Sequence, residues 1–336
     1  MNSFSTDVVR STPRQRNGQQ RLQLIMAHGL AALTMIYLSH SLPALLPGDF
    51  VTTMYSNSFV TLTGEQEAEL RSFFSSGESF CHYLLRLFTL DWGLSYSSLI
   101  PVSSLFFQAL PWTLLLMGSA NIIALSLGFV GGIEAAWRRD TKLEKTMVGA
   151  MTALEGMPEI CTGVLLLAIF SLHYQWFPAG GAETAYAEYS TAQRILDLAH
   201  HLALPLLTLV IAYLPGNFLM ARNSMVMVLK KSYITTARAK GLPSRRVRYA
   251  HGARNALLPV ATRFCLRIAF MMTGALVVER IYCYPGLGTL LFNAIQARDL
   301  PVIHAVVLVS SLMVLTTILV LELLYPLLDP GIKHAQ

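Results

Sequence analysis

The chain has 336 residues, of which 54% are hydrophobic and only 13% are charged, and its formal net charge at pH 7 is +6. Soluble domains carry about 25% charged residues, so this composition excludes an ordinary soluble protein and is typical of a polytopic membrane protein. Because the charges cluster between long hydrophobic runs, the net charge indicates which side each connection faces rather than a nucleic-acid-binding surface.

Six hydrophobic runs are long enough to cross a bilayer, which takes about 20 helical residues. The preceding residues 1–21 are too polar for a signal peptide, so we expect the first run to remain as an anchor. Arg263 and Arg267 interrupt the fifth run, which has the weakest pattern. The predicted transmembrane helices are Leu22–Leu46 (residues 22–46), Leu110–Ile133, Thr146–Leu172, Leu198–Ala221, Pro259–Val278 and Val302–Leu327.

Lys and Arg are alternately abundant and scarce along the connections between these runs. The connections that face one side are rich in them: four occur in 1–21, four in 134–145 and nine in 222–258. The others contain two in 48–109, one in 173–197 and two in 279–301. Since positively charged connections stay in the cytoplasm, this pattern predicts a cytoplasmic N-terminal tail (1–21) and a cytoplasmic C-terminal tail (329–336).

The first outer connection, residues 47–109, is predicted to be an extracytoplasmic loop with short helices. It follows L-P-G-D (Leu46–Asp49), whose Pro-Gly ends the first helix. Residues 64–90 contain amphipathic helical sequence, and Leu99–Gln108 is expected to form a separate helix at the membrane interface. In the second run, Gly128, Gly131 and Gly132 predict close packing against another helix.

Two pairs of charged residues lie inside predicted spans. Glu155 and Glu159 are one helical turn apart in the third run, and Arg263 and Arg267 are one turn apart in the fifth. This spacing places each pair on one helix face, and a rise of about 1.5 Å per residue gives both pairs similar depths. Isolated charges are unfavourable there, so we expect the two spans to contact each other through these residues. A structural ion pair is favoured, and direct contact with a transported substrate is the alternative.

The sequence predicts no catalytic residues, metal site or cofactor. It lacks a G-x-x-x-x-G-K-[ST] motif, so we expect that this chain does not itself bind or hydrolyse ATP. Neither the histidines, including His200 and His201, nor the four cysteines show metal-ligand spacing. Whether Cys81 and Cys283, both on the outer side, form a disulfide stays open.

The basic connection at residues 222–258 contains no Asp or Glu. Its segment Tyr233–Lys240 is rich in good helix formers, and Gly241 supplies a stop. We therefore predict a short cytoplasmic helix between the fourth and fifth spans, with Gly241 in a left-handed conformation and Pro259 in the first turn of the next span.

Several motifs along the chain match one protein family. T-A-R-A-K-G-L occupies 236–242, with Thr235, Thr236 and Ala237 at the positions of a loose E-A-A motif that here lacks its Glu. A distal Leu258-Pro259 follows, then E-R-I-Y-C-Y-P-G-L-G (Glu279–Gly288), N-A-I-Q-A-R-D-L-P-V (Asn293–Val302) and D-P-G-I-K (Asp329–Lys333). The chain thus resembles the inner-membrane permease subunits of ATP-binding-cassette (ABC) importers in the dipeptide, oligopeptide and nickel branch.

The resemblance implies an all-α polytopic protein with six transmembrane helices, the type I ABC importer permease fold and a core at 110–328. It implies a multi-pass protein of a bacterial inner membrane, surrounded by lipid. The expected partners are a second permease subunit, usually in a heterodimer, two cytoplasmic ATP-binding subunits and an extracytoplasmic substrate-binding protein. The implied ATPase-coupling residues are Tyr233, Thr235, Thr236, Ala237, Ala239, Gly241 and Leu242.

The same resemblance favours peptides as substrates, with nickel or a metal chelate as the alternative. Glu279 occupies an acidic position common in the branch, for which we favour a structural role over a place in the translocation pathway. A self-contained secondary transporter or channel is the main alternative of another class, but it predicts internal repeats that the sequence does not display. A membrane-embedded enzyme is a further alternative, with no nucleophile motif to support it.

Overall fold

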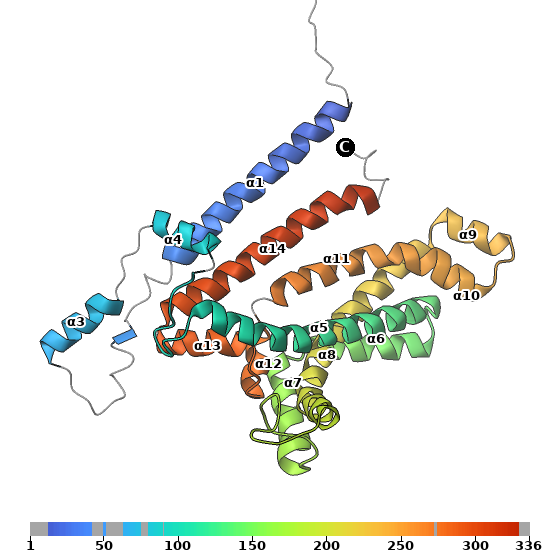
Figure 1. Ribbon diagram of the computed structural model, residues 1–336. Coiled ribbons are helices and arrows are strands. Elements are labelled where there is room, and N and C mark those ends of the chain that lie inside the picture. Colours follow the sequence, from blue (N-terminus) through green and yellow to red (C-terminus); the bar gives the residue numbers. More distant parts are fainter. Residues whose placement is uncertain are drawn as a thin grey trace, which may run out of the picture.

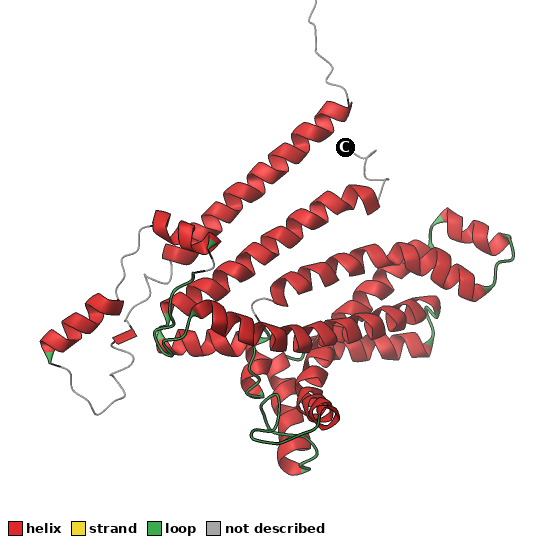
Figure 2. Ribbon diagram, in the orientation of Figure 1, coloured by secondary structure: helices red, strands yellow, loops and turns green. Residues whose placement is uncertain are grey.

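The computed structural model describes residues 13–41, 50–51, 63–74, 80–89, 91–271 and 274–328. Helices dominate this part of the chain, and no β-strand occurs in it (Figure 2). The L-P-G-D and D-P-G-I-K motifs, the C-terminal tail and the first twelve residues lie outside the described residues.

Four helices are long and apolar enough to cross a membrane, or five if a bent pair forms one span. The prediction of an all-α polytopic protein is therefore confirmed, whereas the count of six spans is not. The four helices are α1 (Pro13–Ser41), α5 (Val102–Trp137), α8 (Thr191–Leu229) and α14 (Leu300–Leu328), and the bent pair is α6 (Lys142–Glu155) with α7 (Glu159–Leu166) and its π-helical continuation η2 (Leu167–His173).

The third predicted span, Thr146–Leu172, is not a single straight helix. The chain turns by 93° between α6 and α7, at residues 156–158. Pro158 has no backbone N–H to continue the helix, and its ring disfavours helical geometry at the preceding residue. Figure 1 shows α7 leaving the direction of α6 and pointing away from the other long helices.

The fifth predicted span is also interrupted. Helix α11 (Arg254–Phe270) ends before Gly274, whose φ of +74° is left-handed, and the chain restarts as the short α12 (Leu276–Ile281). Glycine adopts such a φ without steric penalty, so Gly274 permits a sharp change of direction. Val278 thus lies in a separate buried helix rather than at the end of α11.

The outer connection contains two short helices, as predicted, namely α3 (Gly64–Phe74) and α4 (Phe80–Phe88). The separate interfacial helix predicted at Leu99–Gln108 is wrong, because α5 begins at Val102 and continues unbroken to Trp137. The preceding loop is fixed by Asp299, which is buried just before α14 after α13 (Leu287–Ala297). Its carboxylate accepts hydrogen bonds from the Ser95 and Ser97 hydroxyls at 2.5 and 2.8 Å.

Helices α5 and α8 form the central pair of the fold. A methyl group on Gly132 would lie 2.5 Å from the Phe218 carbonyl oxygen and 2.8 Å from the Arg222 nitrogen, and one on Gly128 would lie 2.8 Å from the Asn217 Cβ. The glycines therefore let the two backbones approach closely, which confirms the packing role predicted for them. Elsewhere along the pair, Leu116 of α5, Leu209 of α8 and Tyr282 after α12 belong to one buried cluster.

Replacing Gly132 with leucine should destabilise the protein, because no space exists for a side chain between α5 and α8. Overpacking of this kind costs about 1–3 kcal/mol, so thermal unfolding of the detergent-solubilised protein should shift to lower temperature. Gly149 is the matched control, since it is an exposed helical glycine on which an added methyl group would meet nothing within 4 Å. Equal melting temperatures for Gly132→Leu and Gly149→Leu would contradict the close-packing role.

Candidate functional site

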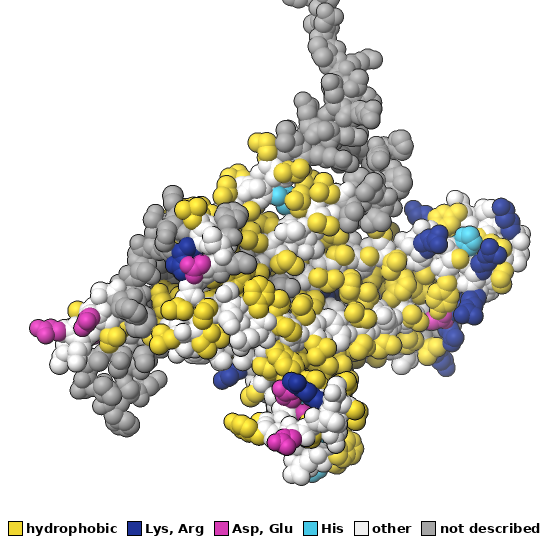
Figure 3. Space-filling view, in the orientation of Figure 1, with side chains coloured by type: hydrophobic (Ala, Val, Ile, Leu, Met, Phe, Trp, Pro, Cys, Tyr) yellow, Lys and Arg dark blue, Asp and Glu magenta, His cyan; other side chains and the backbone are white. Residues whose placement is uncertain are grey.

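The basic connection forms a compact helical cap at one end of the molecule. Helix α9 follows α8 directly, and the chain returns through a short α10 and the π-helical η3 into α11 (Figure 1). Figure 3 shows Lys and Arg side chains gathered over this end, opposite the acidic side chains on α3. The three elements of the cap are α9 (Ser232–Ala239), α10 (Ser244–Arg246) and η3 (Val247–Ala253).

The predicted cytoplasmic helix and its stop are both present in this cap. Helix α9 lies within one residue of the predicted Tyr233–Lys240, and Gly241 has a φ of +72°. The Gly241 N–H donates to the Arg238 carbonyl at 2.9 Å, which closes the last turn of the helix. Glycine is the residue that most readily adopts this conformation at a helix end.

One face of α9 packs against the protein itself. Ile234 and Ala237 are buried in a cluster with Val247, and Trp137 from the end of α5 and Leu229 from the end of α8 pack against that cluster. The three-residue spacing of Ile234 and Ala237 puts both on the same helix face. Helix α9 is therefore joined to the ends of α5 and α8, so that a displacement of α9 would be passed to both.

The seven residues predicted to couple to an ATPase divide into two groups. Ala237 is buried and Leu242 is half-buried against the same cluster, so these two hold α9 in place. The other five are exposed: Tyr233, Thr235, Thr236, Ala239 and Gly241.

Two arginines of the cap lie against the ring of Trp137. The Arg238 guanidinium lies 5.1 Å from the centre of the Trp137 ring, and that of Arg248 lies 4.9 Å from it. Arg248 also forms an ion pair with Glu134, whose carboxylate accepts a hydrogen bond from the Tyr249 hydroxyl at 2.6 Å. That hydrogen bond raises the pKa of Tyr249, because the carboxylate stabilises the protonated phenol.

These contacts leave an open cleft at the surface of the cap. Its volume is about 470 Å³, and it is lined by Glu134, Arg245, Arg248 and Tyr249. Of the arginines that line the cleft, Arg248 is held between the Trp137 ring and Glu134, so its guanidinium has a defined position at the basic end of the protein.

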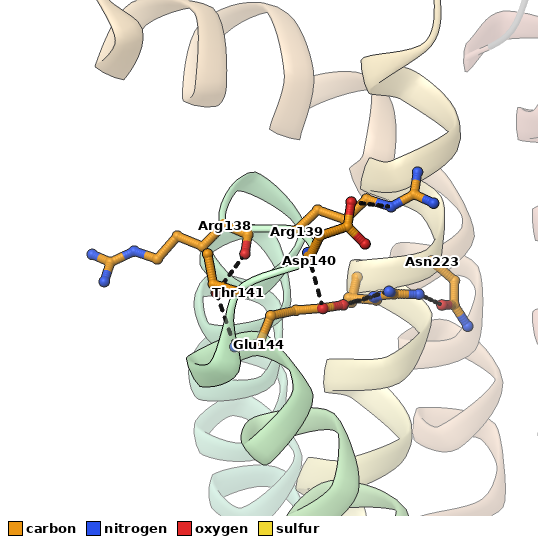
Figure 4. Close-up of polar contacts among 7 residues, drawn as sticks. Arg138, Arg139, Asp140, Thr141, Glu144 and Asn223 are labelled. Atoms are coloured by element: carbon orange, nitrogen blue, oxygen red, sulfur yellow. Dashed lines mark hydrogen bonds and ion pairs between the residues drawn. The ribbon is translucent and has the colours of Figure 1, made fainter.

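A second ion pair, not predicted from the sequence, joins α8 to the start of α6. The Glu144 carboxylate is buried, accepts from the Arg222 guanidinium and also accepts from the Asp140 N–H at 3.3 Å (Figure 4). The Thr141 hydroxyl accepts from the Glu144 N–H at 3.3 Å, which caps the start of α6. The only local signal for this pair is the single Glu in the first turn of the helix that follows Thr141.

The charged residues inside the predicted spans make one long contact between opposite charges, rather than the close structural ion pairing that the sequence favours. Arg263 Nη2 and Glu155 Oε1 are 4.0 Å apart, and both side chains are about one-third exposed or more, at 31% and 43%. Glu155 ends α6 and Glu159 begins α7, so the 93° bend separates them and the prediction that they share a helix face is wrong.

Both arginines of this group are instead held by neutral partners on α8. Arg263 Nη1 donates to the Gly216 carbonyl oxygen at 3.1 Å, and the Arg267 guanidinium lies 3.9 Å from the centre of the Tyr213 ring. Glu159 is half-buried and lies near enough to Arg267 to interact electrostatically, but within the described part of the chain it makes no hydrogen bond or ion pair. Among these four charged residues, the contact within 4.0 Å between the third and fifth predicted spans is thus limited to Arg263 and Glu155.

Glu279 lies apart from these residues, and its side chain is fully buried. Its carboxylate accepts hydrogen bonds from the Thr113 hydroxyl at 2.9 Å, the Thr289 N–H at 3.0 Å and the Ala275 N–H at 3.2 Å. It therefore joins α5, α12 and α13 and does not line an accessible surface, in agreement with the structural interpretation.

Within the described residues, no group of three or more His, Cys, Asp and Glu side chains could hold a metal ion. Cys283 is a free thiol, and the side chain of Cys81 lies outside the described residues.

Comparison with known proteins identifies the family. Residues 128–334 match the model of the family described as binding-protein-dependent transport system inner membrane component. The chain is 36% identical over 292 residues to the oligopeptide transport system permease protein AppB of Bacillus subtilis (strain 168), covering 86% of this chain and 90% of that protein.

Two further relatives are also transport system permease proteins. The chain is 32% identical over 327 residues to the dipeptide transport system permease protein DppB of Escherichia coli (strain K12), covering 92% and 95% of the two chains. It is 36% identical over 256 residues to the glutathione transport system permease protein GsiC of Salmonella choleraesuis (strain SC-B67), covering 76% and 79%. The chain therefore belongs to the family of binding-protein-dependent transport system inner-membrane components, and it is a multi-pass permease of the inner membrane.

Proposed function

We propose that this permease subunit forms half of the translocation pathway of an ABC importer for peptides. A second permease completes the pathway, two cytoplasmic ATP-binding subunits drive it, and an extracytoplasmic binding protein delivers the substrate. The basic cap and both termini face the cytoplasm, since the connection that contains the cap, residues 222–258, carries nine Lys and Arg and no Asp or Glu.

The observation that carries this proposal is the position of α9. The helix offers an exposed polar surface to a partner on one face, while its other face is packed onto the ends of α5 and α8. An ATPase that moves α9 as a rigid unit thereby moves two membrane-spanning helices, which is the kind of rigid-body motion that alternating access requires.

Peptides are the proposed substrates because relatives that align over most of this chain are named for oligopeptide, dipeptide and glutathione transport. Glutathione is itself a small peptide with free charged groups. Nickel and metal chelates, the alternative from the sequence, have no support among these three relatives.

Two measurements test the proposed function. The tagged chain, purified from its native membrane, should bring down an ATPase and a second permease. A strain that lacks the chain should lose uptake of a labelled dipeptide and regain it with the wild-type gene. Recovery of the chain without an ATPase would contradict the subunit assignment, and loss of Ni²⁺ uptake with normal dipeptide uptake would contradict the substrate.

A further inference from the structure

The most unusual charges of the molecule lie in its membrane-spanning part and are not neutralised by one another. Arg263, Arg267 and Glu159 come from two helices, and the structure records no ion pair within 4.0 Å between either arginine and Glu159. Among these described residues, the contact of opposite charges is the one between Arg263 and Glu155, at 4.0 Å. A structural ion pair would bring the charges into direct contact with bidentate geometry, and that geometry is missing.

The arginines are nevertheless held in fixed positions. The Arg267 guanidinium rests on the Tyr213 ring, and Arg263 donates to the Gly216 carbonyl oxygen. Gly216 leaves room for this contact, because a methyl group there would overlap the Arg263 guanidinium in its present position. Cation–π and carbonyl contacts orient a guanidinium without cancelling its charge, so both groups remain able to bind an anion.

Charges at membrane depth usually pair with one another or with backbone carbonyls, or face a water-filled cavity, and they often mark substrate pathways. The side chain of Arg263 is 31% exposed and that of Glu155 is 43% exposed, and both Glu159 and Arg267 are half-buried. The group thus forms an accessible surface with guanidinium groups on α11 and carboxylates at the bend between α6 and α7.

We infer that this surface is a binding site for the charged ends of a peptide in the translocation pathway. This inference rests on the proposed function. Arg263 and Arg267 bind the carboxylate of the peptide through paired N–H donors, the geometry for which guanidinium groups are suited. Glu159, with Glu155 beside the bend, binds the ammonium group. A zwitterionic peptide can pair with the arginines and with the glutamates at the same time, whereas a free metal cation can pair only with the carboxylates.

The test uses the complete importer, with its ATPase, second permease and binding protein, reconstituted in proteoliposomes. Uptake of trialanine is compared with uptake of its C-terminal amide and its N-acetyl derivative. The binding protein is the same throughout, so its own preference cancels when each variant's uptake ratio is divided by that of the wild type.

For Arg267→Gln, uptake of trialanine should fall about ten-fold, as expected for one lost charge-assisted contact, while uptake of the amide changes little. Glu159→Gln should lower the preference for trialanine over the N-acetyl peptide in the same way. Arg267→Lys retains the charge but not the paired N–H donors or the guanidinium contact with Tyr213, so it should restore only part of the ratio. Lys145→Gln, which removes an exposed charge from α6 outside the group, is the matched control and should leave every ratio unchanged.

If Arg267→Gln and Glu159→Gln lower uptake of all three peptides equally, the group is structural and the inference is wrong. If the wild-type importer assembles and hydrolyses ATP but takes up none of the three peptides, the proposed peptide function fails, and the inference fails with it. Recovery of each variant in the assembled complex, measured on the same preparations, separates these results from misfolding.

Discussion

Replacing the exposed Ala239 with glutamate should separate the chain from its ATPase while leaving the chain's own fold intact. Ala239 lies on the exposed face of α9, in a connection that carries nine basic residues and no acidic one. A partner that fits this basic surface presents complementary negative charge, so a new carboxylate there introduces repulsion as well as bulk. Loss of ATPase in affinity purification and a fall in uptake of about ten-fold or more are expected.

The neighbouring Ala237 gives the contrasting result, because its side chain faces inward. It is buried with Ile234 and Val247, beneath Trp137. Ala237→Arg should therefore lower the melting temperature of the isolated subunit, whereas Ala239→Glu should change its stability by no more than about 0.5 kcal/mol, as is typical of surface substitutions.

Thr146→Glu is the matched control for Ala239→Glu, since it adds the same charge to an exposed position on another helix, α6. It should retain both the ATPase and uptake. Full recovery of the ATPase with Ala239→Glu, at normal protein levels, would contradict the assignment of α9 as the coupling helix.

The sequence was sufficient to predict α9 because its signals are local. Helix-forming residues and the terminal Gly241 determine that a helix forms and where it ends. The orientation of the helix was not predicted, although the apolar residues Ile234 and Ala237, three positions apart, indicate the face that packs inward. This spacing, applied to the coupling motif, would have assigned Ala237 to the buried side.

The directions of the helices and the contacts between residues far apart in the sequence were much harder to predict. Hydropathy measures the length of an apolar run but not the direction of its axis, so Thr146–Leu172 was predicted as one span despite Pro158 at its centre. The ion pair between Glu144 and Arg222 joins residues 78 positions apart, and nothing in either local sequence specifies the other. The contacts of Arg263 and Arg267 with α8 are non-local in the same sense.

Glu279 illustrates how a charge within a hydrophobic region can be structural. Its surroundings are crowded by glycines: a methyl group on Gly286 would lie 2.5 Å from the Glu279 carboxylate oxygens, and one on Gly288 would lie 2.8 Å from Oε2. The P-G-L-G turn therefore wraps closely around the carboxylate, and small residues are needed for its backbone N–H groups to reach it.

Glu279→Ala should consequently be among the most destabilising single substitutions in the chain. It removes the acceptor for the Thr113 hydroxyl and for the Ala275 and Thr289 N–H groups, all in a buried site. Each buried donor left without a partner costs about 1–3 kcal/mol, and the cavity adds to this loss. We expect a large fall in the melting temperature of the solubilised protein, or failure of the protein to accumulate in the membrane.

Glu279→Gln and Glu322→Ala distinguish this role from a role in the pathway. The glutamine retains one acceptor oxygen but turns an N–H donor towards the remaining donors, so its destabilisation should be intermediate. Glu322 is an exposed acidic residue of α14, and its replacement by alanine should leave the melting temperature unchanged. If Glu279→Gln melted like the wild type but lost uptake, the carboxylate would belong to the translocation pathway. If its uptake per folded molecule stayed normal while its stability fell, the carboxylate would hold α5, α12 and α13 together without taking part in transport.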